Sequence, residues 1–215
     1  MKRIALTLCT ATTLLFACNS GSNDKAKSDT ATTTKTEVKP DVPMTPPDTA
    51  QMRKNWEGYM ALGDMHKMMA SWDGTWDADM TLYQPGAPEE KTKGTTVNKM
   101  VLGGRYQESS HNSVMMGMPF EGHGTLGYDN AKKMFESVWI DNMGTGVVKM
   151  SGPWDAATKS INLTGKMTEP ATLKETDYRE VFTVIDDNTQ KMEMFSPGPD
   201  GKEVKMMEIK FTRKK

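Results

Sequence analysis

Histidine is the residue type in this chain best suited to metal or proton chemistry, and the sequence holds three. His111 and His123 flank a predicted hairpin turn near Gly117, so their imidazoles would face each other if the turn is centred on that glycine. With Glu121 or Glu108 nearby, they could ligate a transition metal. A register shift of one residue would send one imidazole to the other face. We therefore keep the pair as weak metal candidates and expect no cofactor.

Methionine is the second residue type with possible metal chemistry, because thioethers are soft ligands for copper(I). The chain holds 20 methionines, with clusters at residues 65–69 and 115–118. Methionine is also a flexible filler of cores and adaptable surfaces. A helical spacing already explains the first cluster as packing, so packing is the favoured interpretation.

Catalytic patterns are missing from the sequence. Neither a nucleophile elbow nor a metalloprotease or phosphate-loop motif occurs. Asp129, Asp155 and Asp187 stand where turns need a side chain that bonds its own backbone. Asp141 is the least explained acid, but one carboxylate does not make a mechanism. We expect a protein that is not an enzyme.

The first residues carry an export signal. A positive start at Lys2 and Arg3 precedes an apolar and small-residue run over residues 4–16. This run is too short for a permanent membrane helix, which needs about 20 residues. Residues 15–18, Leu-Phe-Ala-Cys, resemble a lipobox. That resemblance implies cleavage before Cys18 and a thioether-linked diacylglycerol on it, with acyl chains such as palmitate anchoring the chain to a membrane.

The chain thus divides into a signal peptide at residues 1–17, a lipidated cysteine and tether at 18–47, and one folded domain at 48–215. The tether is rich in Ser, Thr, Asp, Lys and Pro, so it buries too little apolar surface to offset the conformational entropy lost on ordering. We therefore expect it to be disordered. Asn19 is not the aspartate associated with inner-membrane retention. The expected location is therefore the outer membrane of a Gram-negative bacterium, on either face.

Charge and cysteine content narrow the class of protein. The formal net charge is −1, and Lys and Arg alternate with Asp and Glu along the chain, which excludes the basic stripe of a nucleic-acid binder. Cys9 leaves with the signal and Cys18 is acylated, so no disulfide can form within one mature chain. A domain of about 165 residues buries about 70% of its unfolded surface and needs no such staple.

The folded domain is predicted to begin with helical turns. Asp48 and Gln51 form a capping-box pattern, and apolar residues then recur at helical spacing from Met52 to Met60. A second apolar stripe follows Asp64, which we take as its N-cap. These helical turns precede the first strand.

From Gly74 onward the hydrophobic period is two, and turn residues interrupt short β-rich runs at regular intervals. The predicted turns centre on residues 84–86, 102–104, 116–119, 129–130, 143–144, 155–157, 186–188 and 197–201. Connections this short make sequence neighbours into sheet neighbours, and closure removes the exposed edges of such a meander. The predicted fold is all-β, an antiparallel up-and-down barrel of about nine or ten strands after a short N-terminal helical segment.

Gly74-Thr75-Trp76 at the start of the first strand resembles the Gly-x-Trp signature of lipocalins and their calycin relatives. In those proteins an Arg from the last strand packs over the Trp. Arg213 is the matching residue here, and the resemblance implies that it lies within cation–π reach of Trp76 and closes the barrel.

A longer resemblance covers roughly residues 52–213. It rests on four motifs in order: Gly-Met-Pro-Phe-Glu-Gly at 117–122, Gly-Tyr-Asp-Asn at 127–130, Trp-Ile-Asp at 139–141 and Gly-Pro-Trp-Asp at 152–155. The chain is similar to the bacterial domain of unknown function 1579 family. The resemblance implies an exported, lipocalin-like β protein without an assigned activity.

Two uses of the barrel remain open, together with a less favoured enzyme. A hollow interior would bind a small apolar ligand, whereas a filled one would serve as a structural or interaction module of the cell envelope. Protein partners cannot be named from the sequence. The aromatic residues expected to wall a cavity are Phe120, Phe135, Trp139, Trp154 and Phe182.

Overall fold

The computed structural model describes residues 48–84, 86–170, 172–198 and 200–215. Two helices come first, α1 (Thr49–Met60) and α2 (Asp64–Ser71). The strands are β1 (Gly74–Leu82), β2 (Glu90–Val101), β3 (Tyr106–Met115), β4 (Met118–Asp129), β5 (Met134–Asp141), β6 (Val148–Gly152), β7 (Trp154–Asp155), β8 (Ser160–Glu169), β9 (Lys174–Asp186), β10 (Thr189–Pro197) and β11 (Glu203–Arg213). Cys9, Cys18 and the predicted tether lie outside the described residues.

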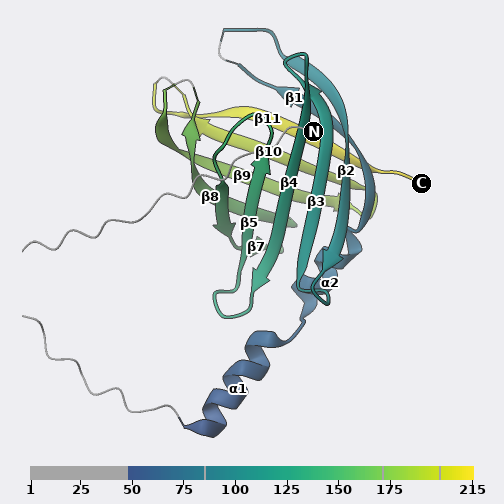
Figure 1. The fold of residues 1–215 in the computed structure, drawn as a ribbon, viewed down its shortest axis with the longest axis vertical. Helices are drawn as coiled ribbons and strands as arrows, with labels where there is room; N and C mark the ends of the chain where they lie inside the picture. Colours follow the sequence, from purple (N-terminus) through teal and green to yellow (C-terminus); the bar gives the residue numbers. More distant parts are fainter. Residues whose placement is uncertain (1–47, 85, 171, 199) are drawn as a thin grey trace, which may run out of the picture. The chain divides into compact units, whose positions relative to one another are not determined.

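The strands form one antiparallel sheet that closes on itself (Figure 1). Consecutive strands pair with each other except β6 and β7, which both pair with β8, and β1 also pairs with β11. β6 and β7 share one register against β8 and are separated at Pro153, which has no N–H to donate. Counted together, β6 and β7 form one interrupted strand, so the barrel has ten strands. The predicted all-β antiparallel barrel is confirmed.

The first helix begins as the sequence indicates, because the Asp48 carboxylate accepts a hydrogen bond from the Ala50 N–H at 3.2 Å. None of its residues is buried, and Trp56 is 60% exposed. Within the described residues, no helix is long and apolar enough to cross a membrane.

The second helix closes one end of the barrel. Its N-cap is Gly63 rather than the predicted Asp64, because the His66 Nδ1 atom accepts a hydrogen bond from the Gly63 N–H at 3.2 Å. Met69 and the following Trp72 are buried in the larger core cluster, which also contains Phe135 and Leu163. The helix therefore fills the barrel interior at this end.

A smaller apolar cluster lies elsewhere in the barrel. It consists of Ala78, Met80 and Ile209, with partly buried side chains such as Met192 and Phe211 packed against it. The two clusters do not merge into one continuous core, which leaves room for a cavity lined by members of both.

Candidate ligand-binding cavity

A cavity of about 360 Å³ occupies the barrel interior. Its lining is dominated by apolar side chains, and nine of the methionines take part. They are Met80, Met115, Met116, Met143, Met150, Met167, Met192, Met194 and Met207. Methionine has three rotatable bonds and a polarisable sulfur, so this lining can adapt to more than one ligand shape.

Strand alternation explains how the sequence produces the wall formed by β9. Side chains on a strand alternate between the two faces of the sheet. Tyr178 and Phe182 pack with the interior core cluster, and Glu180 lies between them on the same face. Arg179, one residue away, points outward to pair with Glu203. A charged residue has therefore been placed on the inner face of the barrel.

Glu180 is the functional candidate that the structure adds. Its neighbours across the adjacent strands are Leu163 in β8 and Met194 in β10, both apolar. Across the described part of the chain, the Glu180 carboxylate has no hydrogen-bond or ion-pair partner. Burial raises its pKa to about 7, because the charged form is poorly solvated. The exposed part of this side chain faces the cavity, which it lines.

Unlike the apolar wall around Glu180, the wall formed by β2 and β3 carries polar side chains on its inner face. Most of these groups bond to one another or to α2. The Ser109 hydroxyl donates to the Asn98 Oδ1 at 2.7 Å, and the Gln107 Nε2 donates to the Met69 carbonyl at 2.7 Å. The cavity is thus polar on one side and rich in methionine on the other.

His111 is part of this polar wall and is only 4% exposed. Its Nδ1 lies 2.8 Å from the Thr96 hydroxyl, whereas its Nε2 is buried without a partner among the described residues. Burial lowers the pKa of His111 below its ordinary value, which favours a neutral imidazole near pH 7. A neutral ring adds no positive charge to the cavity.

The hypothesis that His111 and His123 share a metal is wrong. The hairpin register pairs His111 with Gly122 and Ser110 with His123, so the two imidazoles point to opposite faces of the sheet. His123 is exposed, and its Nε2 lies 3.2 Å from a Glu121 carboxylate oxygen. Within the described residues, no three His, Cys, Asp or Glu side chains are grouped for a metal ion.

Three of the five aromatic residues predicted to wall a cavity do so: Phe120, Trp139 and Phe182. Phe135 and Trp154 are not among the lining residues. Phe135 is fully buried in the core cluster with Met69 of α2, and Trp154 packs against that same cluster. The sequence did not reveal that α2 fills this end of the barrel.

Trp139 lies flat against β4, where two glycines leave space for its ring. A Cβ atom added at Gly122 would overlap the indole, and one at Gly124 would lie 3.1 Å from it. The Trp139 Nε1 donates to the Asp141 Oδ2 at 2.9 Å, and the other Asp141 oxygen accepts from the Met143 N–H. Asp141, unexplained by the sequence, therefore holds the cavity wall and the following turn in place.

Trp76 and Arg213 meet across the pair of strands that joins the two ends of the domain. They are cross-strand partners in β1 and β11, and the Arg213 Cζ lies 4.2 Å from the centroid of the Trp76 ring. This is the cation–π contact that the lipocalin resemblance implied. The guanidinium also donates to the carbonyls of Ser71, Asp73 and Asp187, at 2.6, 2.6 and 3.0 Å.

One protein family and several solved structures match this chain. The family described as "Protein of unknown function (DUF1579)" matches residues 61–213. Rv2717c from M. tuberculosis superposes with a TM-score of 0.56 at 14% identity, covering 72% of this chain and all of that one. The S-type phycobiliprotein lyase CPES from Guillardia theta gives a TM-score of 0.47 at 11% identity, covering 75% of this chain and 97% of that one. No curated protein matches the sequence.

Proposed function

The chain belongs to the DUF1579 family of proteins of unknown function, and from that premise we propose that its barrel binds a small, largely apolar ligand. The observation that carries the proposal is the interior cavity. Its volume of about 360 Å³ lies within the range of roughly 300 to 1,000 Å³ that is usual for small-molecule sites. We propose a binding role rather than catalysis.

The composition of the lining supports this role. Small-molecule pockets combine mostly apolar walls with a few polar groups that orient the ligand. Here methionines and aromatic rings supply the apolar surface, and the buried His111 Nε2 has no hydrogen-bond partner among the described residues. The Glu180 carboxylate, which lines the cavity, likewise has no hydrogen-bond or ion-pair partner among them. Such atoms are costly in a core that is merely packed.

The proposed binding is tested by placing a bulky side chain from β5 inside the cavity. Ser137 lines the cavity, whereas Val138, the next residue of β5, is 40% exposed and does not line it. We expect Ser137→Phe to abolish binding of a lipophilic fluorescent dye, and Val138→Phe to leave it intact. Both variants are measured in the full chain carrying Cys18→Ser, which removes the acylation site, and their folding is checked by thermal unfolding. Equal dye binding by Ser137→Phe and Val138→Phe would count against an interior site.

We further propose that lipid on Cys18 holds the protein at the cell envelope, in the outer membrane of a Gram-negative bacterium. The support is the export signal and the lipobox-like stretch at residues 15–18. Radiolabelled palmitate should label the wild-type protein and a Cys9→Ser variant, but not a Cys18→Ser variant. Labelling of the last variant, or its retention in the membrane fraction, would contradict the anchor.

The exposed apolar side chains of α1 favour a second candidate, an interaction module. Trp56 and Tyr59 are 60% and 54% exposed and contact each other edge to face. Under this alternative the barrel is only a scaffold, so no lipophile shifts its unfolding temperature. Chemical crosslinking in the envelope would instead depend on Trp56 and Tyr59.

A further inference from the structure

We propose that the cavity selects lipophilic amines, molecules with an apolar body and one protonated nitrogen, and that Glu180 pairs with the nitrogen. This inference rests on the proposed ligand-binding function and names the class of ligand.

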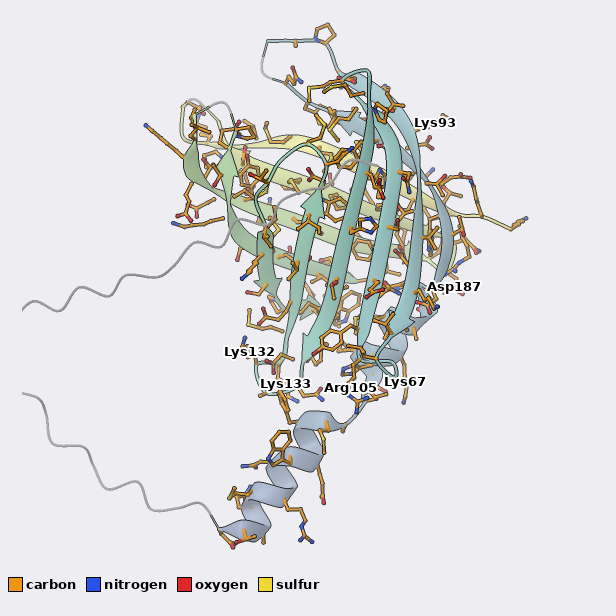
Figure 2. All side chains as sticks on the ribbon, viewed as in Figure 1. Lys67, Lys93, Arg105, Lys132, Lys133 and Asp187 are labelled. Atoms are coloured by element: carbon orange, nitrogen blue, oxygen red, sulfur yellow. The ribbon has the colours of Figure 1, made fainter. Side chains whose placement is uncertain are left out.

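The cavity is lined by acidic side chains but by no Lys or Arg among the described residues. Its carboxylates are those of Glu180 and Asp141. Basic side chains lie on the outer wall or at the end near α2, as Figure 2 shows for Lys93, Lys132 and Arg105. An anionic head group inside the barrel would therefore meet negative charge without a compensating cation.

The two carboxylates that line the cavity differ in whether their oxygens already accept hydrogen bonds. Both oxygens of Asp141 accept hydrogen bonds, from the Trp139 indole and from the Met143 N–H. Glu180 has no such partner among the described residues, and its facing neighbours Leu163 and Met194 are apolar. Glu180 is therefore the carboxylate left available to a ligand.

Among the described residues of the strands packed against β9, no other charged group faces Glu180. The inner face of β8 contributes Ile161, Leu163 and Met167, and that of β10 contributes Gln190, Met192 and Met194. From the more distant walls, His111 and Asp141 are the titratable groups that line the cavity. A bound ammonium would be the missing counter-charge, and its pairing with Glu180 would offset the cost of burying both ions.

The remaining lining suits the rest of an amphiphilic amine. The methionine-rich wall around Glu180 would contact its apolar body, and methionine adapts to flexible chains. Because the pKa of Glu180 is about 7, amine binding should shift this carboxyl to its ionised form and release a proton. Affinity for an amine should thus be about tenfold weaker at pH 6 than at pH 8.

The test uses three probes with the same tail and different head groups: decylamine and decanoate below their critical micelle concentrations, and decanol below its solubility limit. Binding to the full chain carrying Cys18→Ser is measured by isothermal titration calorimetry at pH 6 and pH 8. We expect decylamine to bind at least ten times more tightly than decanol or decanoate at pH 8. Titrations in two buffers of different ionisation enthalpy should report proton release at pH 7.

Glu180→Gln removes the charge and keeps the shape of the side chain, while Glu175→Gln is the matched control on the same strand, where Glu175 is exposed. Glu180→Gln should lose the preference for decylamine and its pH dependence, yet still bind decanol. Glu175→Gln should behave as the parent chain. Thermal unfolding checks that each variant is folded.

The outcomes separate this inference from the proposed function. If all three probes bind equally well, or if decanoate binds best, selection of amines is overturned while ligand binding stands. An unchanged preference in Glu180→Gln would equally overturn the role of this residue. If no probe binds, the inference fails, and the proposed function fails with it only if the lipophilic dye does not bind either.

Discussion

Replacing Glu180 with Gln should change how the stability of the protein depends on pH. Burial raises the pKa of Glu180 from its ordinary 4.5 to about 7. A carboxyl with a raised pKa in the folded state stabilises the fold below its unfolded pKa, and this contribution is lost as pH rises through the folded value. Between about pH 4.5 and 7, Glu180 should therefore ionise in the unfolded chain while it stays protonated in the barrel, and the free energy of unfolding should fall.

The size of the effect follows from the pKa difference. One pKa unit corresponds to about 1.4 kcal/mol, so the full difference amounts to about 3 kcal/mol above pH 7. Water entering the cavity would solvate the carboxylate and reduce this to about 1 kcal/mol. Gln has nearly the same shape and no charge. Glu180→Gln should therefore be about 1 to 3 kcal/mol more stable than the parent chain at pH 8, but nearly equal to it at pH 4.5.

Urea unfolding of the full chain carrying Cys18→Ser, followed by tryptophan fluorescence from pH 4.5 to 8, measures this difference. Buried His66 and His111 have lowered pKa values and change stability in the opposite direction, with a gain as pH rises towards 6.5. Their effect is common to both proteins and cancels in the comparison. Glu175→Gln serves as the exposed control. Parallel pH profiles for the parent and Glu180→Gln would refute a buried, unpaired carboxyl.

Four further substitutions test the barrel and α1, each by urea unfolding. Arg213→Ala should cost about 2 to 3 kcal/mol, since it removes the cation–π contact with Trp76 and three hydrogen bonds to carbonyls, and Arg213→Lys should recover only part of this. Gly122→Ala should cost about 1 to 3 kcal/mol and shift tryptophan emission, because the new Cβ overlaps the Trp139 ring; unchanged emission would contradict this packing. Gly58→Ala in α1, where a Cβ meets nothing within 4 Å, should instead stabilise by about 0.5 to 1 kcal/mol and increase the helical circular dichroism signal.

Local patterns in the sequence were sufficient to predict the strands, their turns and the closure of the sheet. The period of two and the regularly spaced turns predicted the meander, and short connections left each strand beside its sequence neighbour. The Gly-x-Trp signature and the terminal Arg213 identified the contact between the first and last strands. These features depend on neighbouring residues or on a family signature, so one sequence can reveal them.

Local sequence patterns did not predict which side chains line or fill the barrel interior. The inward position of Glu180 could have been found, because it alternates with Tyr178 and Phe182 along one strand. The sequence could not reveal that α2 fills one end, which places Phe135 in the packed core rather than in the cavity wall. The one-residue register that puts His111 inside and His123 outside was likewise undetermined.

The physical reason is the difference between local and long-range constraints. Alternation and turn chemistry are properties of a few consecutive residues, so the sequence by itself determined that this chain forms a β meander and where its strands turn. Which side chains meet inside a closed sheet depends on the register of every strand and on what occupies its ends. Only the tertiary structure decided that the interior keeps a cavity and that Glu180 faces it among apolar neighbours.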